Sequence, residues 1–329
     1  MNRLIYLSLF FIFSLFSYAE ELEYELGKGL QVGTLPLFVG GYISVNYENS
    51  SDTLKIDDIA VLAYGSYDRL SYMLELETED IDINFNGEEE EKEEQIHIER
   101  IFFTYEFDEN YALRVGKYNS QIGFWNLMPI NVLRDTTSSP MVTELLFPKF
   151  TNGLDVKYSS ENRLPYSVHL MLQENEDIDR WINDDVYNNF DIDRHYGINV
   201  LVDNSMLSYM FNAGYFRTVD QENKYYFLGA FQYLDSSFKL LGELGVQFND
   251  DGVTLPYIAY LQYSKQLAKD HEAIVRVESY SDKETDIDDT FAILGYTYRP
   301  LAPIALKAEY QWHSLHKEDK LLFSISILF

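Results

Sequence analysis

The chain has 329 residues, no cysteine, 54 acidic side chains and only 25 basic ones, which gives a formal net charge of -29. The absence of cysteine excludes disulfides, thiolate nucleophiles and cysteine-based zinc sites. The negative charge argues against nucleic acid as a partner, because such binding depends on clustered lysine and arginine.

The amino end has the features of a secretory signal. The first three residues are weakly basic, residues 4–16 form an apolar run too short to span a bilayer as a helix, and Ser17 and Ala19 place small residues at the -3 and -1 positions of a signal-peptidase site. We therefore expect residues 1–19 to be a signal peptide that is cleaved after Ala19.

The exported chain is expected to have two parts. Residues 20–37 are too few for a plug domain, and we interpret them as a short periplasmic segment ahead of a membrane domain at 38–329. No stretch after the signal approaches eighteen consecutive apolar residues, so a membrane domain must be a closed β-barrel.

Segments of about ten residues with alternating polarity follow one another from residue 38 to the end, separated by turn-type residues. Sixteen are predicted, at 38–48, 54–66, 68–79, 95–107, 110–118, 151–159, 164–173, 193–203, 206–217, 223–234, 236–249, 254–266, 270–281, 290–299, 303–313 and 319–329. The predicted fold is an all-β, transmembrane antiparallel barrel of about sixteen strands, with fourteen as the alternative.

The connections between these segments alternate in length. If the amino end lies in the periplasm, even-numbered strands lead to short periplasmic turns and odd-numbered strands to longer outer loops. The long connections all fall on the outer side, at 80–94, 119–150, 174–192 and 282–289.

The last segment, LLFSISILF, is typical of a barrel-closing strand. Phe323 and Ile325 fall on one face, Ser324 and Ser326 on the other, and the chain ends in the aromatic Phe329. Aromatic residues make up 16% of the chain although its mean hydropathy is negative, as aromatic girdles around a wet interior require. We expect the barrel-assembly machinery to recognise this strand.

Alternation also indicates which charges face the lumen. A charged side chain on the lipid face costs about 2 to 4 kcal/mol at mid-depth, so charged residues in strands should point inward. The predicted lumen-facing charges are Arg100, Arg114, Lys117, Asp155, Lys157, Lys239, Glu243, Arg276, Glu278, Lys307 and Glu309. Their mixed signs are compatible with rings that set ion preference and equally with structural ion pairs.

The long connection 119–150 is unusually apolar for a loop in water. Its apolar side chains include Ile122, Phe124, Trp125, Leu127, Met128, Ile130, Val132 and Leu133, and an exposed patch of this size would be a liability. We expect the loop to fold inward against the barrel wall. Folding over the rim, or against a neighbouring subunit, is the alternative.

The same region resembles a known family. A strand ending in Gly116-Lys117-Tyr118, followed by Gly123 and a proline-bearing loop, is similar to the porin families that include the phosphate-selective porins. The resemblance implies a homotrimer, with a pore narrowed by loop 119–150. The constriction residues would then be Gly123, Trp125, Arg134, Asp135, Glu144 and Lys149. Gln121 and Ile122 replace a Pro-aromatic pair of that family, so the solute is not carried over.

A calcium-loop spacing occurs in the acidic connection 80–94. The residues that match it are Asp82, Asn84, Asn86 and Glu93. Strands rather than helices flank the segment, and the run EEEEKEE makes chance spacing of carboxylates common. A solvated acidic loop facing lipopolysaccharide is the preferred interpretation, and we expect neither a resident metal nor a cofactor.

Catalytic motifs are missing from the sequence. The six histidines show no HExxH spacing, and neither GxSxG nor a glycine-rich phosphate loop occurs, so no enzyme is expected. The predicted function is a porin for small polar or ionic solutes in the outer membrane of a Gram-negative bacterium, with outer-membrane lipid and lipopolysaccharide as partners. The alternative is an outer-membrane ligand receptor or siderophore-type transporter that recognises its ligand through the outer loops 80–94 and 174–192.

Overall fold

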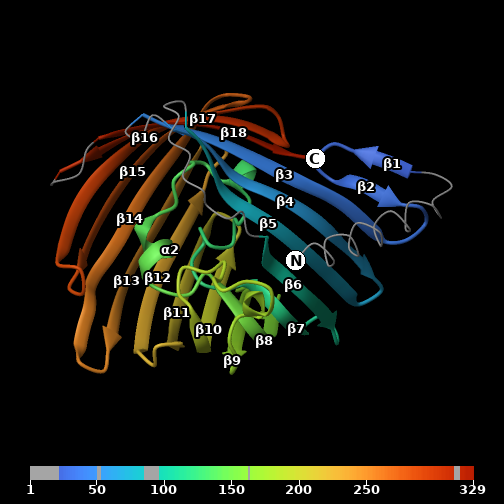
Figure 1. The fold of residues 1–329 in the computed structure, drawn as a ribbon, viewed down its shortest axis with the longest axis horizontal. Helices are drawn as coiled ribbons and strands as arrows, with labels where there is room; N and C mark the ends of the chain where they lie inside the picture. Colours follow the sequence, from blue (N-terminus) through green and yellow to red (C-terminus); the bar gives the residue numbers. More distant parts are fainter. Residues whose placement is uncertain (1–21, 50–52, 85–95, 162–163, 315–318) are drawn as a thin grey trace.

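The computed structural model shows strands that wrap around a common axis (Figure 1). It describes residues 22–49, 53–84, 96–161, 164–314 and 319–329. The predicted signal peptide, 1–19, lies outside the described residues. Within the described ranges, no helix is long and apolar enough to cross a membrane.

The predicted barrel is confirmed, and all sixteen predicted segments are strands. They are β3 (Leu37–Glu48), β4 (Thr53–Tyr67), β5 (Leu70–Asn84), β6 (His97–Glu106), β7 (Tyr111–Asn119), β8 (Phe150–Ser160), β9 (Tyr166–Gln173), β10 (Ile192–Asn204), β11 (Leu207–Thr218), β12 (Asn223–Leu234), β13 (Phe238–Asn249), β14 (Gly252–Ala268), β15 (His271–Asp282), β16 (Ile287–Leu301), β17 (Ile304–His313) and β18 (Lys320–Leu328). Each pairs with its neighbour in an antiparallel ladder.

The last strand closes the barrel against the first. Strand β18 pairs with β3 in a register that sets Ile325 opposite Val45. Beyond the strand, the Phe329 N–H donates to the Gly41 carbonyl at 2.7 Å, and the Gly41 N–H donates to the Phe329 carbonyl at 2.8 Å. The carboxy terminus therefore completes the ladder that closes the barrel formed by β3 to β18.

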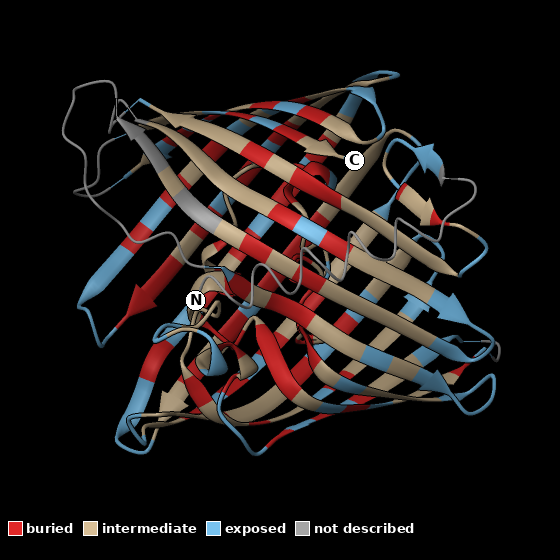
Figure 2. Cartoon of the chain, turned by 45° about the vertical axis from the view of Figure 1, so that its right-hand side comes forward, coloured by how far each residue is buried: buried red, intermediate tan, exposed pale blue. Residues whose placement is uncertain are grey.

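Burial alternates along the strands as the polarity of the sequence predicts (Figure 2). In β18, Ser324 and Ser326 are buried inside the barrel, whereas Phe323 is 45% and Ile325 50% exposed on the outside. Because successive side chains point to opposite faces of a strand, one period-2 sequence supplies both an apolar belt and a polar interior.

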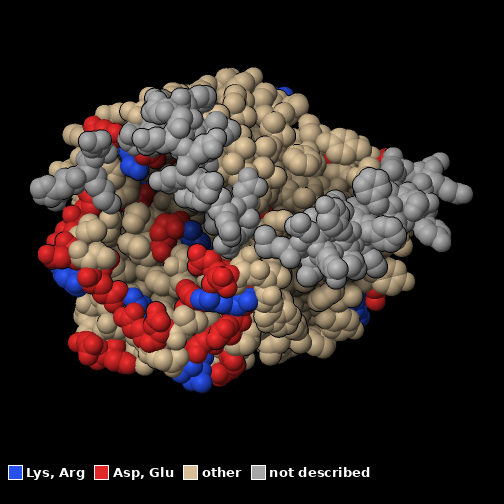
Figure 3. All heavy atoms as spheres, in the orientation of Figure 1, with Lys and Arg blue, Asp and Glu red and all other residues tan. Residues whose placement is uncertain are grey.

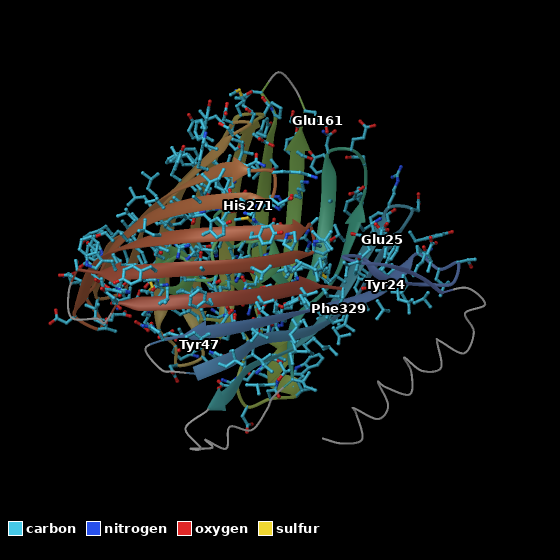
Figure 4. All side chains as sticks on the ribbon, turned by 90° about the horizontal axis from the view of Figure 1, so that it is seen from above. Tyr24, Glu25, Tyr47, Glu161, His271 and Phe329 are labelled. Atoms are coloured by element: carbon cyan, nitrogen blue, oxygen red, sulfur yellow. The ribbon has the colours of Figure 1, made fainter. Side chains whose placement is uncertain are left out.

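Residues ahead of β3 form a hairpin that the sequence did not predict. Strands β1 (Leu22–Glu25) and β2 (Gly29–Val32) pair with each other, and β2 also pairs with β3. In Figure 4, Tyr24 and Glu25 of this hairpin lie at the same end of the barrel as Phe329, while Tyr47 lies at the other. The predicted short amino-terminal segment is therefore partly a strand extension of the wall.

Two connections differ in length from the prediction. Strand β5 continues to Asn84, so the connection predicted at 80–94 begins later, and the β15–β16 connection is only residues 283–286 instead of 282–289. The polar ends of these strands continue the ladder because backbone pairing does not require apolar side chains. Pro256 lies within β14, where the register with β13 shifts, and such irregularities tolerate proline.

Candidate pore constriction

The connection between β7 and β8, residues 120–149, is folded inside the barrel, and we call it the inward loop (Figure 1). It contains the 3-10 helix η1 (Asn131–Leu133) and the short helix α2 (Met141–Leu145). Its apolar side chains form one core with the inner wall: Ile122, Trp125, Val142, Leu146 and Phe147 are all fully buried. Burial of these side chains stabilises the inward position of the loop.

The apolar side chains of the loop meet apolar side chains of the wall. Trp125 and Phe147 share a cluster with Met171 of β9, Phe216 of β11 and Ile258 of β14. Ile130 lies near a second cluster, made of Tyr42, Ala60 and Leu62 on β3 and β4. The inward loop therefore contacts both sides of the barrel interior, and Leu133, at 51%, is one of its exposed apolar residues.

Three wall carboxylates receive backbone N–H groups of the inward loop. Glu243 accepts from Phe124 at 2.6 Å and Trp125 at 3.2 Å. Glu278 accepts from Met141 at 2.7 Å, and Glu309 from Thr137 and Ser138. Since a folded-in loop has no ladder partner for its N–H groups, these carboxylates supply the acceptors that burial requires.

Wall cations bind the carbonyl and hydroxyl oxygens of the same loop. Arg276 donates to Thr136 Oγ1 at 2.7 Å and Ser138 Oγ at 2.8 Å, and it pairs with Glu278 at 2.7 Å. Lys307 donates to Asn131 Oδ1 at 2.6 Å. Lys239 forms an ion pair with Asp135 of the loop.

Of the predicted lumen-facing charges, one group therefore lies at the inner wall in contact with the inward loop. This group consists of Lys239, Glu243, Arg276, Glu278, Lys307 and Glu309. The sequence placed these residues on the inner face but could not identify their partner, because the partner is a loop distant in sequence.

The other predicted charges lie on β6, β7 and β8. Arg100 pairs with Glu75, and the Arg114 guanidinium lies 4.8 Å from the centre of the Phe102 ring. Asp155 pairs with His169 at 3.0 Å. In the β8–β9 register, Lys157 is opposite the same histidine and is half-buried.

Lys117 is the fifth residue of that set, and it is fully buried. Its Nζ lies 2.8 Å from Asp177 Oδ1 in the connection after β9, and 5.5 Å from the centre of the Phe150 ring. A buried, paired lysine is not available to passing ions, so its position differs from that of a group in open lumen.

Three of the predicted constriction residues surround one cavity of about 230 Å³, which Arg134, Glu144 and Lys149 line together with Glu99 and Tyr187. Lys149 pairs with Glu144 at 2.6 Å. Arg134 Nε donates to the Met128 carbonyl at 2.8 Å, which holds its half-buried guanidinium at this cavity.

The remaining three contact the inner wall of the barrel. Trp125 is fully buried, and Asp135 accepts from Gln262 Nε2 at 2.7 Å and Ser264 Oγ at 3.1 Å. Gly123 adopts a φ of +67°, and a Cβ added there would lie 2.9 Å from a Glu243 carboxylate oxygen. Only glycine reaches both this backbone conformation and this approach without strain.

Sequence reasoning missed an acidic cluster on the inner wall. The carboxylates of Glu75, Glu77 and Glu99 each offer an oxygen within 4.8 Å of the others, and all three are buried. The Tyr42 hydroxyl lies 2.9 Å from a Glu77 oxygen and 3.0 Å from a Glu99 oxygen, and its single proton is shared between them. Glu75 and Glu77 are two apart in β5, so the period-2 pattern contained the signal. Three carboxylates at this spacing have the chemistry of a divalent-cation site.

Only the first two residues of the calcium-loop candidate lie in the part of the chain that the structure describes. Asp82 and Asn84 lie on β5, opposite Lys55 and Thr53 of β4. Asn86 and Glu93 lie outside the described residues. A strand at the first two positions does not form the tight turn on which the calcium motif depends.

The connection after β9, residues 174–191, also folds into the barrel mouth, which the sequence did not predict. Asp179 is fully buried, pairs with His97 Nδ1 at 2.6 Å and accepts from the Ile98 N–H at 2.9 Å and the Tyr187 N–H at 2.9 Å. Burial alone would raise the pKa of Asp179, but the hydrogen bonds from these groups outweigh it and lower the pKa below its ordinary value.

The outer rim is acidic. Figure 3 shows Asp and Glu side chains gathered along the lower left edge, where the outer ends of β13 to β16 lie. Exposed carboxylates there include Asp250, Asp251, Glu284 and Asp286. A rim on which carboxylates outnumber the interspersed Lys and Arg side chains raises the local concentration of cations over that of anions.

Comparison with known proteins identifies the fold but no family. No protein-family model matches the chain, and no curated protein matches it. Among solved structures, OmpF from Salmonella typhi in complex with daunomycin is similar, with a TM-score of 0.64, 9% identity, and coverage of 94% of this chain and 100% of that chain.

Two further solved structures have the same architecture. The anion-selective porin from Comamonas acidovorans has a TM-score of 0.56 and 14% identity, and the match covers 89% of this chain and 99% of that chain. OmpT of Vibrio cholerae, in a trimer form, has a TM-score of 0.58 and 11% identity, with the same two coverages. At these identities the likeness shows the fold alone, which is that of outer-membrane porins.

Proposed function

We propose that the protein is an outer-membrane porin through which small polar or ionic solutes diffuse passively. The observation that carries the proposal is a closed barrel whose inward loop is bound to the wall by charged residues such as Glu243, Arg276 and Glu309. A receptor or adhesin does not need its third outer loop bound inside the lumen, whereas a porin uses such a loop to set the size of its pore.

The inward loop provides the constriction in this proposal. Arg134, Glu144 and Lys149 line the passage, whereas Gly123, Trp125 and Asp135 keep the loop in place. The wall cluster of Glu75, Glu77 and Glu99 lies on β5 and β6, where Arg100 pairs with Glu75. A solute would thus pass between a loop with both signs of charge and a wall on which Arg100 lies beside these carboxylates.

Cellular placement and assembly are part of the same proposal. The signal peptide is removed after Ala19, the barrel enters the outer membrane of a Gram-negative bacterium through the barrel-assembly machinery, and three copies associate. The trimer form of a structural neighbour supports the last point for this fold. Amino-terminal sequencing of the mature protein checks the cleavage site, and mass determination in detergent checks the trimer.

Planar-bilayer recording tests the function. The purified protein should produce stepwise conductance without an energy source, and deletion of residues 126–139 should raise the single-channel conductance because it removes the part of the loop that crosses the lumen. A deletion variant that conducts like the wild type would place the narrowest passage elsewhere. A wild-type protein that forms barrels but never conducts would favour the receptor alternative.

A further inference from the structure

We propose that the connection 174–191, here called the strap, positions the inward loop, and that Asn189 and Asp179 are its two positioning residues. The inference rests on the proposed porin function and extends it, because it assigns the geometry of the constriction to a second outer loop. The strap runs from the end of β9 to the start of β10 and contains the 3-10 helix η2 (Ile178–Trp181).

The first part of the strap is fixed to the wall. Asp177 accepts the Asp179 N–H at 3.0 Å at the start of η2, and its carboxylate pairs with Lys117 of β7, with both side chains buried. Asp179 binds His97 and the Ile98 N–H of β6. These contacts hold one end of the strap to the two strands that precede the inward loop.

Asp179 also joins the two halves of the strap. Its carboxylate accepts the Tyr187 N–H at 2.9 Å and the Asn183 Nδ2 at 3.1 Å. Asn183 in turn donates to the Ile96 carbonyl at 2.8 Å. A single buried carboxylate therefore sets where residues 187–189 lie relative to the wall.

The second part of the strap binds the inward loop. The two hydrogens of Asn189 Nδ2 are shared among three carbonyls, those of Thr143 at 3.2 Å, Glu144 at 2.9 Å and Phe147 at 2.8 Å, and its Oδ1 accepts the Lys149 N–H at 2.8 Å. One side chain thus contacts two of the carbonyl groups that α2 leaves free, those of Thr143 and Glu144, while the Leu145 carbonyl accepts from Gln247 of β13. Asn188 makes the equivalent pair of contacts with the Phe150 backbone, at 3.3 and 3.2 Å.

These contacts matter because α2 cannot hold its own position. A helix of five residues is far below the length at which a helix is stable alone. The carboxylates Glu243, Glu278 and Glu309 bind the loop between residues 124 and 141. Beyond that point, Gln247 of β13 donates to the carbonyls of Leu145 and Leu146, and the strap binds backbone groups between residues 143 and 150. Asn189 of the strap therefore binds the backbone of both cavity-lining residues, Glu144 and Lys149.

Single-channel recording of Asn189→Ala tests the proposal, with Asn175→Ala as the matched control in the same strap. Asn175 is exposed, and its side chain donates only to the neighbouring Glu176 carbonyl among the described contacts. We expect Asn189→Ala to raise the time spent in additional conductance levels about tenfold, since several hydrogen bonds to the loop are lost. The control should match the wild type.

A labelling experiment tests the role of the strap independently of whether the protein conducts. The protein has no cysteine, so Thr143→Cys introduces one thiol at a position that is only 3% exposed. A membrane-impermeant thiol reagent should label this thiol slowly. The labelling rate should rise about tenfold when Asn189→Ala or Asp179→Ala is added, and it should stay unchanged when Asn175→Ala is added.

The outcomes are distinguishable. If Asn189→Ala leaves both the conductance levels and the labelling rate unchanged, the inward loop holds its position without the strap, and the inference is wrong. If the wild type does not conduct but the labelling rates change as expected, the strap is supported and the porin proposal fails.

Discussion

Gly123 is the residue whose replacement most directly tests how the inward loop is held. Gly123→Ala would strain a backbone with φ at +67° and push a methyl group to 2.9 Å from the Glu243 carboxylate that binds the Phe124 and Trp125 N–H groups. We expect a loss of about 1 to 3 kcal/mol in the stability of the docked loop. Single-channel recordings should then show frequent transitions to higher conductance.

A matched glycine variant serves as the control. Gly229→Ala adds its Cβ where no atom lies within 4 Å, at a position with no positive φ. It should conduct like the wild type. Equal behaviour of the two variants, whether both altered or both normal, would contradict the role assigned to Gly123.

Asp179 makes the strap sensitive to acid. Its folded-state pKa is lowered by hydrogen bonds from His97 and backbone N–H groups, so the ionised carboxylate stabilises the docked strap above the ordinary aspartate pKa. This stabilisation is lost as the pH falls through the lowered folded-state value. We expect conductance fluctuations to increase below about pH 4.

The substitution Asp179→Asn separates this group from other acids. The amide cannot ionise, so the variant should show raised fluctuations at neutral pH and little further change on acidification. An acid response of wild-type size in Asp179→Asn would assign the pH effect to a different carboxylate.

At the scale of elements, the charge on the inward loop should control ion preference. Arg134→Glu changes two charge units at the cavity that Glu99 and Glu144 also line. In a narrow passage, charges are screened less than in bulk water, so we expect the reversal potential in a salt gradient to shift toward cation preference.

Arg194→Glu is the control for that experiment. The Arg194 side chain is 41% exposed and pairs with the exposed Glu174, and its neighbour in β10, His195, is fully buried, so the arginine points away from the interior. The change should leave the reversal potential unaltered. Lys117→Glu is not suitable for this experiment. It would replace the buried Lys117–Asp177 ion pair by two buried carboxylates, and breaking a buried ion pair lowers the free energy of unfolding by about 3 to 5 kcal/mol.

For the whole molecule, closure of the barrel depends on the carboxy terminus. Deleting Phe329 removes both hydrogen bonds to Gly41 and the ring that lies against that glycine. We expect a marked loss of the compact, heat-modifiable band in gel electrophoresis of membranes. Without these two hydrogen bonds, the end of the β18–β3 ladder is unpaired.

Phe329→Trp keeps an aromatic ring and the terminal backbone and should assemble. Full accumulation of the deletion variant as a heat-modifiable barrel would show that the terminal residue is dispensable for assembly. Failure of both variants would instead indicate that the shape of the phenylalanine ring is required.

Strand identity was predictable because it depends on local information. In β18, the alternation of Phe323, Ser324, Ile325 and Ser326 specifies both a strand and its faces within four residues. The inward fold of the loop was also predictable, since the apolar content around Trp125 requires burial. The extension of β5 to Asn84 was not, because polar strand ends resemble loops.

The tertiary structure alone decided what the inner charges do. Period-2 alternation places Arg276 and Glu309 on the inner face, but whether they meet water or Ser138 depends on how a distant loop crosses the barrel. The same holds for Asn189, an ordinary loop residue in sequence whose four contacts lie between 40 and 46 positions away. The sequence by itself determined the barrel because polarity along each strand repeats every two residues. Docking of the loops depends instead on contacts between segments far apart in the chain, and no local pattern of residues specifies those contacts.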